Sequence, residues 1–153
     1  MTDARSRFNG FKERAAPIPY RELDEFWSSL EPVVAIEFMI GEWRGGDLPT
    51  GHRGDGFLGQ TWFGTTFTSA ADVQPIICVD AQGTKYEDTT LMKGGASLWM
   101  EEFRGEVTAT MVYDAMPIHD HFKKVDDDAV IAVSNGKGAH DNGRLMYFYL
   151  ERL

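Results

Sequence analysis

The sequence predicts a mostly β protein, an antiparallel barrel or sandwich of about eight strands preceded by one helix. Short apolar segments recur from Glu42 onward and are separated by turn-forming Asn, Asp and Gly residues, a spacing typical of antiparallel β proteins. The regular alternation of strands with long helices that marks a parallel sheet is missing from the pattern. At 153 residues the chain is long enough for one domain with its own hydrophobic core.

The N-terminal part of the chain contains the predicted helix. Residues 1–19 are polar and mixed in charge, so we interpret them as an arm that is mobile or wraps the surface. Residues 20–30 carry four apolar side chains at positions i, i+3, i+4 and i+7, which predicts a three-turn helix that packs one face onto something larger. These four are Leu23, Phe26, Trp27 and Leu30. Pro32 ends the helix, and residues 33–40 are equally compatible with a short helix, a turn or a strand.

Eight segments between residue 42 and the C-terminus have the composition of strands. Val107–Asp114 is the clearest, because its side chains alternate regularly and both of its faces can be used. The run from Asp126 to Asp128 and the Asn- and Gly-rich segments 135–138 and 141–143 supply turns. The predicted strands are Glu42–Leu48, Thr61–Phe67, Gln74–Asp80, Ser97–Phe103, Val107–Asp114, Ile118–Val125, Ala129–Ser134 and Leu145–Leu153. No linker interrupts this pattern, so residues 20–153 are expected to form a single barrel domain that is capped by the helix of residues 20–30.

Composition excludes several classes of function. The net charge of −9 argues against binding to nucleic acid and to anionic membrane surfaces, because both need a basic face. No apolar run is long enough for a membrane span, and the first residues lack the apolar core of a signal peptide. Cys78 is the one cysteine, so no disulfide within the chain is available. We therefore expect a cytoplasmic protein in which Cys78 is a core residue.

The glycine-rich segment Gly41–His52, GEWRGGDLPTGH, could in principle hold a phosphate. It contains neither the GxxxxGK[ST] of a P-loop nor the GxGxxG of dinucleotide-binding folds, and no strand-to-helix context accompanies it. We expect instead that its glycines let the first strand bend and let the helix approach closely.

Two segments resemble a known family. The motif Gly41-Glu42-Trp43-Arg44-Gly45, followed by LPTGH, resembles the GXWXG family. MVYDAMPIHDHFKKVDDD and YFYLER resemble its companion segment, domain of unknown function 4334, and the two resemblances together cover most of the chain from Tyr20 onward.

More distantly, the Gly-x-Trp of the first strand is similar to that of calycins, the lipocalin and fatty-acid-binding barrels. This resemblance implies a calycin-like barrel in which the Trp closes one end and an Arg of the last strand packs on its ring. Trp43 and Arg152 are therefore expected to lie together beside the N-terminal helix, with Gly41 and Gly45 in structural roles.

The fold and the aromatic content of 12% lead to a prediction of ligand binding. An eight-stranded barrel either fills with side chains or holds one small ligand. We predict a hydrophobic small molecule, a fatty acid or a similar carboxylate, which Arg44 or Arg104 could anchor. The candidate pocket residues are Trp62, Phe63, Tyr113, His119, His121, Phe122 and Phe148.

Three alternatives remain open. Nitrobindins have a similar start and bind haem, which would use His119 or His121. The same pair, two residues apart on one face of a strand, has a spacing that metal sites use, although one buried and one exposed histidine is the simpler interpretation, and no metal is predicted. An enzyme acting on a small apolar substrate would use Tyr113, Asp114, Asp120 and His121 as an acid–base cluster around Pro117. Dimerisation is also left open.

Overall fold

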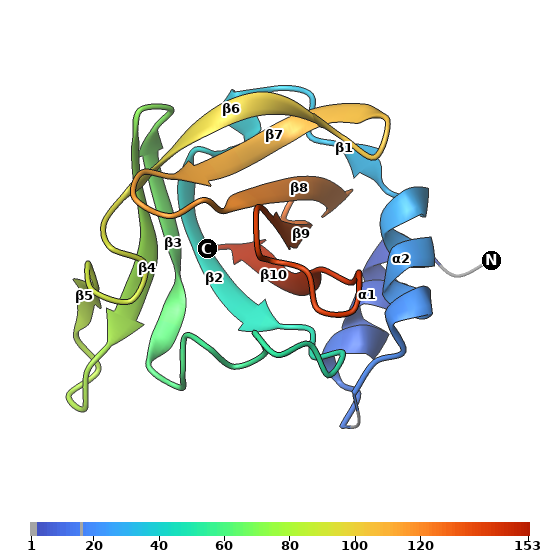
Figure 1. Cartoon of the computed structure of the whole chain (residues 1–153). Coiled ribbons are helices and arrows are strands. Elements are labelled where there is room, and N and C mark those ends of the chain that lie inside the picture. The colour runs from blue at the N-terminus through green and yellow to red at the C-terminus, as the bar shows by residue number, and fades with distance from the viewer. Residues whose placement is uncertain (1–2, 16) are drawn as a thin grey trace.

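Eight strands close into an antiparallel barrel in the computed structural model of the chain, which describes residues 3–15 and 17–153. The order around the barrel is β8-β7-β6-β4-β3-β2-β10-β9, and β9 pairs with β8 to complete the circle (Figure 1). The predicted fold class is confirmed, and each predicted strand overlaps an observed one. The barrel strands are β2 (Gly41–Asp47), β3 (Trp62–Ser69), β4 (Asp72–Val79), β6 (Ala96–Phe103), β7 (Glu106–Tyr113), β8 (His119–Asp126), β9 (Ala129–Asn135) and β10 (Met146–Arg152).

Two short strands, which the sequence did not predict, modify the wall. The first, β1 (Glu31–Pro32), pairs with β8, and the backbone of Val33 just after it bonds to β7 through Ala109 N–H. The other, β5 (Lys85–Glu87), pairs with β4 along residues 77–79. Pairing between β4 and β6 is correspondingly thin, with Val73 opposite Ala96 as its register pair.

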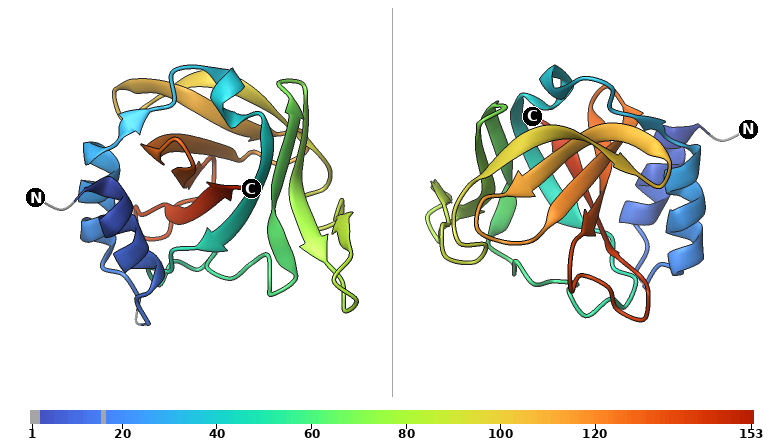
Figure 2. Two further views of the ribbon diagram at one scale, coloured as in Figure 1. Left: turned by 180° about the vertical axis from the view of Figure 1, so that it is seen from behind. Right: turned by 45° about the horizontal axis from the view of Figure 1, so that its top comes forward.

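Two helices, α1 (Ala4–Lys12) and α2 (Tyr20–Ser29), cover the outside of the barrel (Figures 1 and 2). Phe8 of α1 and Phe26 of α2 belong to a buried cluster with the outward-facing Ile131, Val133 and Tyr147 of β9 and β10. The expectation that the helix caps the barrel is therefore wrong. Because β9 and β10 carry apolar side chains on both faces, the apolar stripe of α2 covers the outer face of these two strands.

Within the predicted arm of residues 1–19, α1 packs on the surface of the barrel, and residues 1, 2 and 16 of the arm lie outside the described part of the chain. Phe8 and Phe11, three residues apart, are the buried side chains of this helix. Two large apolar side chains in nine residues are too few for a recognisable periodicity. The helix is capped by Asp3, whose side chain accepts the backbone N–H of Ser6 at 2.7 Å.

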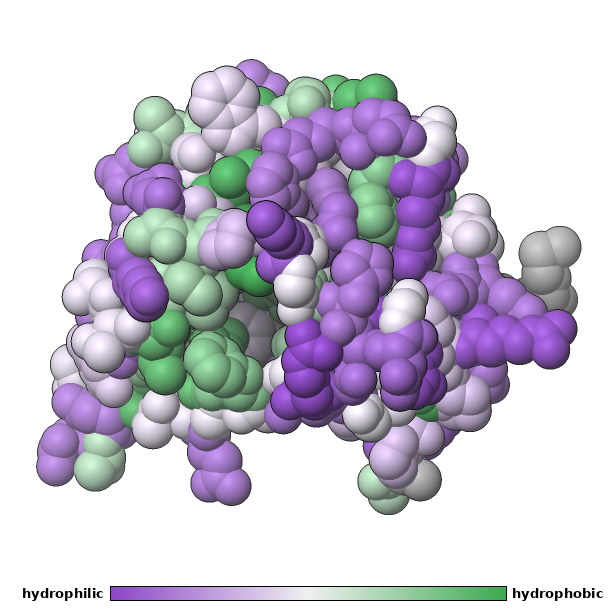
Figure 3. All heavy atoms as spheres, viewed as in Figure 1, coloured by the Kyte–Doolittle hydropathy of each residue, from purple (hydrophilic) through white to green (hydrophobic). Residues whose placement is uncertain are grey.

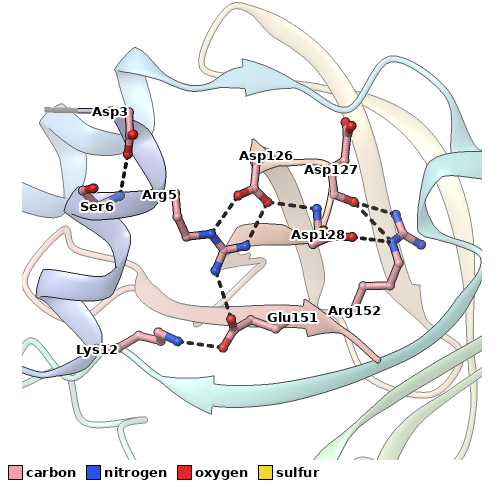
Figure 4. A network of polar contacts seen from close by, with 9 residues as sticks. All are labelled: Asp3, Arg5, Ser6, Lys12, Asp126, Asp127, Asp128, Glu151 and Arg152. Carbon is pink, nitrogen blue, oxygen red and sulfur yellow. Dashed lines mark hydrogen bonds and ion pairs between the residues drawn. The ribbon is translucent and has the colours of Figure 1, made fainter.

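Ion pairs fix α1 to the barrel (Figure 4). Arg5 donates to both oxygens of Asp126, in the β8–β9 hairpin, at 2.7 and 2.9 Å, and to Glu151 of β10 at 3.0 Å. Lys12 donates to the other oxygen of Glu151 at 2.8 Å. The hydrogen bonds from Arg5 lower the pKa of Asp126.

Replacing Arg5 by Ala is expected to loosen α1 and to destabilise the protein by about 1 kcal/mol, because these partly exposed ion pairs are screened by solvent. Hydrogen exchange of the α1 amides and urea unfolding at low and high salt measure the effect. The control is Arg21→Ala, which removes the highly exposed pair of Arg21 with Glu25 on α2. An equal effect of the two replacements would contradict the role assigned to Arg5.

One end of the barrel is closed around Trp43. Its indole N–H donates to Met39 O at 2.8 Å in the 3-10 helix η1 (Ile36–Met39). The guanidinium of Arg152 lies 4.3 Å from the centroid of the Trp43 ring and 4.9 Å from that of Phe38, and it donates to Phe38 O at 2.9 Å. The expected contact between Trp43 and Arg152 is present. The helix that lies beside it is η1 rather than α2.

The glycines of the motif make room for aromatic rings. A Cβ on Gly45 would lie 2.2 Å from the ring of Trp62, and a Cβ on Gly46 would lie 2.2 Å from the hydroxyl of Tyr149. Gly41 has a φ of +132°, a conformation that L side chains rarely adopt. The expectation that these glycines admit the helix is corrected, since side chains of neighbouring strands occupy the space.

Candidate functional site

The barrel contains a cavity of about 230 Å³. Its walls include interior residues of six of the strands, among them Trp62 of β3, Met111 of β7 and Phe148 of β10. Its rim comes from the loops that follow β2, β5, β7 and β9, and the Trp43 end contributes no lining residue. Figure 3 shows hydrophobic side chains gathered around a hollow on the face seen in Figure 1.

The lining is apolar and rich in methionine. Four of the seven methionines of the chain contribute to it, and Trp62 and Phe148 meet edge to face with ring centroids 6.0 Å apart. Phe57, in the loop after β2, is 58% exposed although it lines the cavity. Methionine side chains adapt to irregular ligands, so these walls can follow the shape of an occupant. The four are Met92, Met111, Met116 and Met146.

The predicted pocket residues divide into two groups. Trp62, Tyr113 and Phe148 line the cavity. Phe122 is buried inside the barrel but packs against Phe67, with ring centroids 5.9 Å apart, and does not line the cavity. Phe63 also lies elsewhere, with the cations of Arg44 and Lys85 over its ring at 5.7 and 4.1 Å from the centroid.

His119 and His121 lie on the outer face of β8, and neither lines the cavity. His121 is buried and stacks on Phe103 at 4.1 Å, and its two ring nitrogens meet Thr110 Oγ1 at 2.8 Å and Asn135 Nδ2 at 3.2 Å. Burial, together with the nearby His119 and Arg104, lowers the pKa of His121 to about 4. Both pocket assignments are therefore corrected: the strand alternation that puts Asp120 inside puts its two neighbours outside.

His119 is the more exposed of the pair, and its Nδ1 lies 2.7 Å from Glu101 Oε1. The simple interpretation of one buried and one exposed histidine fits, but neither side chain enters the barrel. Within residues 3–15 and 17–153, no three His, Cys, Asp or Glu side chains are grouped so that they could hold a metal ion.

A buried carboxyl group provides the polar feature of the site. Asp120 is 1% exposed, and it accepts Tyr113 Oη–H at 3.0 Å and Ser134 Oγ–H at 2.8 Å. Burial raises the pKa of Asp120 to about 7, although the two hydrogen bonds and the nearby His119 act in the opposite direction. Burial also raises the pKa of Tyr113 well above its usual value, so this phenol stays protonated. Both hydroxyl-bearing residues line the cavity.

Of the four residues predicted for an enzyme, the fold brings two together. Tyr113 and Asp120 are hydrogen bonded, whereas His121 lies on the opposite face of β8 and Asp114 is exposed beyond the end of β7. The acid–base cluster expected around Pro117 is therefore incomplete. The second hydrogen-bond partner of Asp120 is Ser134 and not the predicted His121.

The loop between β2 and β3 was missed as part of the site. His52 Nδ1 accepts the N–H of Gly54 at 2.9 Å, so its Nε2 carries the proton toward Ala139 O, 3.0 Å away. Arg53 donates to the carbonyl groups of residues 138 and 140. These hydrogen bonds connect the loop to the β9–β10 connection across the rim. The glycine-rich sequence of the loop is the feature from which its part in the site could have been predicted.

Comparisons with known proteins agree with this architecture. Residues 25–83 match the family model described as "GXWXG protein", and residues 94–152 match the model "Domain of unknown function (DUF4334)". A crystal structure of a protein from Thermomonospora curvata is 35% identical, with 99% of each chain covered and a TM-score of 0.86. Among curated proteins nothing matches the chain. In the part of the chain that the structure describes, no helix is long and apolar enough to cross a membrane.

Proposed function

We propose that the chain, which belongs to the family that joins a GXWXG segment to a DUF4334 segment, binds a neutral, apolar small molecule in the barrel cavity. The observation that carries the proposal is the apolar cavity of about 230 Å³ with Tyr113 and Ser134 in its wall. Cavities with apolar walls and a few convergent polar groups are typical of small-molecule sites.

The volume sets the size of the ligand. An apolar protein cavity of about 150 Å³ holds benzene, so this one has room for roughly ten non-hydrogen atoms. A long-chain fatty acid would have to extend through the rim. The size favours compact molecules such as monocyclic alcohols, ketones and hydrocarbons.

The charges favour a ligand without a carboxylate. Asp47 lines the cavity, and burial raises the pKa of its carboxyl. Arg53, the arginine among the described lining residues, already donates to two backbone carbonyls. Neither Arg44 nor Arg104 lines the cavity. The anionic head of a fatty acid would thus lack a free cation and would meet Asp47.

Haem ligation by His119 or His121 gains no support from the geometry. Both rings lie outside the cavity, and both nitrogens of His121 already have partners. The histidine in the cavity wall, His52, is likewise engaged at both nitrogens.

Filling the cavity tests the proposal. Met146→Trp adds bulk at a lining position and is expected to weaken the binding of menthol at least about tenfold, as titration calorimetry would measure. The matched control is Met100→Trp, because Met100 is 37% exposed and is not a lining residue. Equal affinity of the wild type and a folded Met146→Trp variant would contradict binding in this cavity. Native mass spectrometry of freshly purified protein would identify a co-purified ligand.

A further inference from the structure

Three polar groups converge at one place in the cavity wall. The groups are the side chains of Tyr113 on β7, Asp120 on β8 and Ser134 on β9. These strands are adjacent, and Asp120 is the register partner of Met111 on β7 and of Ser134 on β9. The Tyr113 and Ser134 hydroxyl groups each bond to a different oxygen of Asp120. Tyr113 and Ser134 line the cavity, whereas Asp120 lies behind them. The residues of this cluster that a ligand in the cavity can contact are therefore Tyr113 and Ser134 rather than Asp120.

The hydrogen-bonding capacity of these hydroxyl groups depends on the proton of Asp120. An ionised carboxylate only accepts, so it holds both hydroxyl protons and leaves oxygen lone pairs to face the cavity. A protonated carboxyl donates one hydrogen bond of its own. Its O–H then donates a hydrogen bond to one of the two hydroxyl oxygens, and that hydroxyl group is free to point its own hydrogen into the cavity.

We propose that Asp120, through Tyr113 and Ser134, selects ligands by the hydrogen-bonding character of their polar group. With the carboxylate ionised, the site accepts a hydrogen bond and takes alcohols. With the carboxyl protonated, it also donates one and takes ketones. This inference rests on the proposed function, because it concerns the ligand of the same cavity.

The surroundings of Asp120 allow this behaviour near neutral pH. The pKa of about 7 follows from burial of the carboxyl group between neutral partners. His119, the residue before Asp120 on β8, acts on it electrostatically and favours the ionised carboxylate.

The other neighbours are few. From β7 the carboxyl group meets Tyr113, which stays protonated, and from β9 it meets the neutral Ser134. The remaining ionisable groups of the cavity wall are Asp47 on β2 and His52 and Arg53 in the loop that follows it.

A matched pair of ligands tests the inference. Menthol and menthone have the same carbon skeleton and differ in carrying a hydroxyl or a carbonyl group, and p-menthane carries neither. Titration calorimetry at about pH 5.5 and about pH 8.5 would give the three affinities. We expect menthone to bind about three- to tenfold more weakly at the higher pH, which corresponds to one hydrogen bond. Menthol and p-menthane are expected to change less than about twofold.

Asp120→Asn assigns the effect to this carboxyl group. The amide of Asn always has an N–H donor beside an acceptor oxygen, so it keeps the donating ability of the protonated carboxyl at every pH. Menthone should then bind with the affinity that the wild type has at low pH, at both pH values. Asp114→Asn, the same replacement at an exposed position outside the cavity lining, should keep the pH dependence of the wild type.

The outcomes separate the two proposals. If none of the three compounds binds, or if Met146→Trp binds them as well as the wild type, the proposed function fails. If all three bind with the same pH dependence, or if Asp120→Asn retains the pH dependence of menthone, the proposed function stands and the selection by Asp120 is overturned.

Discussion

Replacing Asp120 by Asn is expected to stabilise the protein at alkaline pH far more than in acid. The pKa of Asp120 rises from 3.8 to about 7 on folding, so the folded state holds this proton more tightly than the unfolded state. The stability from this group is therefore complete below about pH 4 and is lost as the pH rises to about 7. Between pH 5 and pH 8 the loss is about 3 kcal/mol, and the Asn variant avoids it.

Urea unfolding of the two proteins at pH 5, 6, 7 and 8 would measure the difference. His121 acts in the opposite direction, because its pKa falls from 6.5 to about 4 on folding and its stability contribution is lost as the pH drops through this window. The wild-type profile between about pH 4 and 6.5 is thus flattened by two opposing groups, whereas the Asn variant should gain stability with rising pH there. A constant difference between the two proteins at all pH values would contradict the buried, protonated carboxyl.

Gly45→Ala is expected to destabilise the barrel by about 3 kcal/mol, the upper range for an overpacked core. The new Cβ would lie within 2.2 to 2.9 Å of three atoms of the Trp62 ring, so the ring must leave its place. Because Trp62 lines the cavity, ligand affinity should fall together with stability. Denaturant unfolding and menthol titration measure the two effects.

A double-mutant cycle isolates the contact. Trp62→Leu removes the ring, so adding Gly45→Ala to this variant should cost less than about 1 kcal/mol. The control is Gly10→Ala in α1, where nothing lies within 4 Å of an added Cβ and the helix should gain about 0.5–1 kcal/mol. If Gly45→Ala costs the same with and without Trp62, the explanation of the second motif glycine is wrong.

The barrel could be predicted because its information is local. Each strand alternates over a few residues and ends at Asn, Asp or Gly, and Tyr20–Ser29 shows helical periodicity by itself. The contact of Trp43 with Arg152 was within reach because resemblance to calycins implies it. The side of the barrel that the helices cover could not be predicted. Both faces of β9 and β10 are apolar, and their sequence does not tell which face the helices cover.

The site was predicted less completely than the fold. Trp62, Tyr113 and Phe148 line the cavity as expected, but the three residues predicted from β8, His119, His121 and Phe122, do not. Alternation fixes two opposite faces of a strand and leaves undecided which one points inward. Ser134 and the four methionines carry no motif, and they reach the cavity only through the closure of the barrel.

The crystal structure of the protein with menthol tests the central claim most directly. We predict density for one menthol molecule inside the barrel, packed against Trp62 and Phe148, with its hydroxyl group within hydrogen-bonding distance of Tyr113 or Ser134. A cavity that stays empty at saturating menthol, or a molecule bound only on the outer surface, would contradict the account.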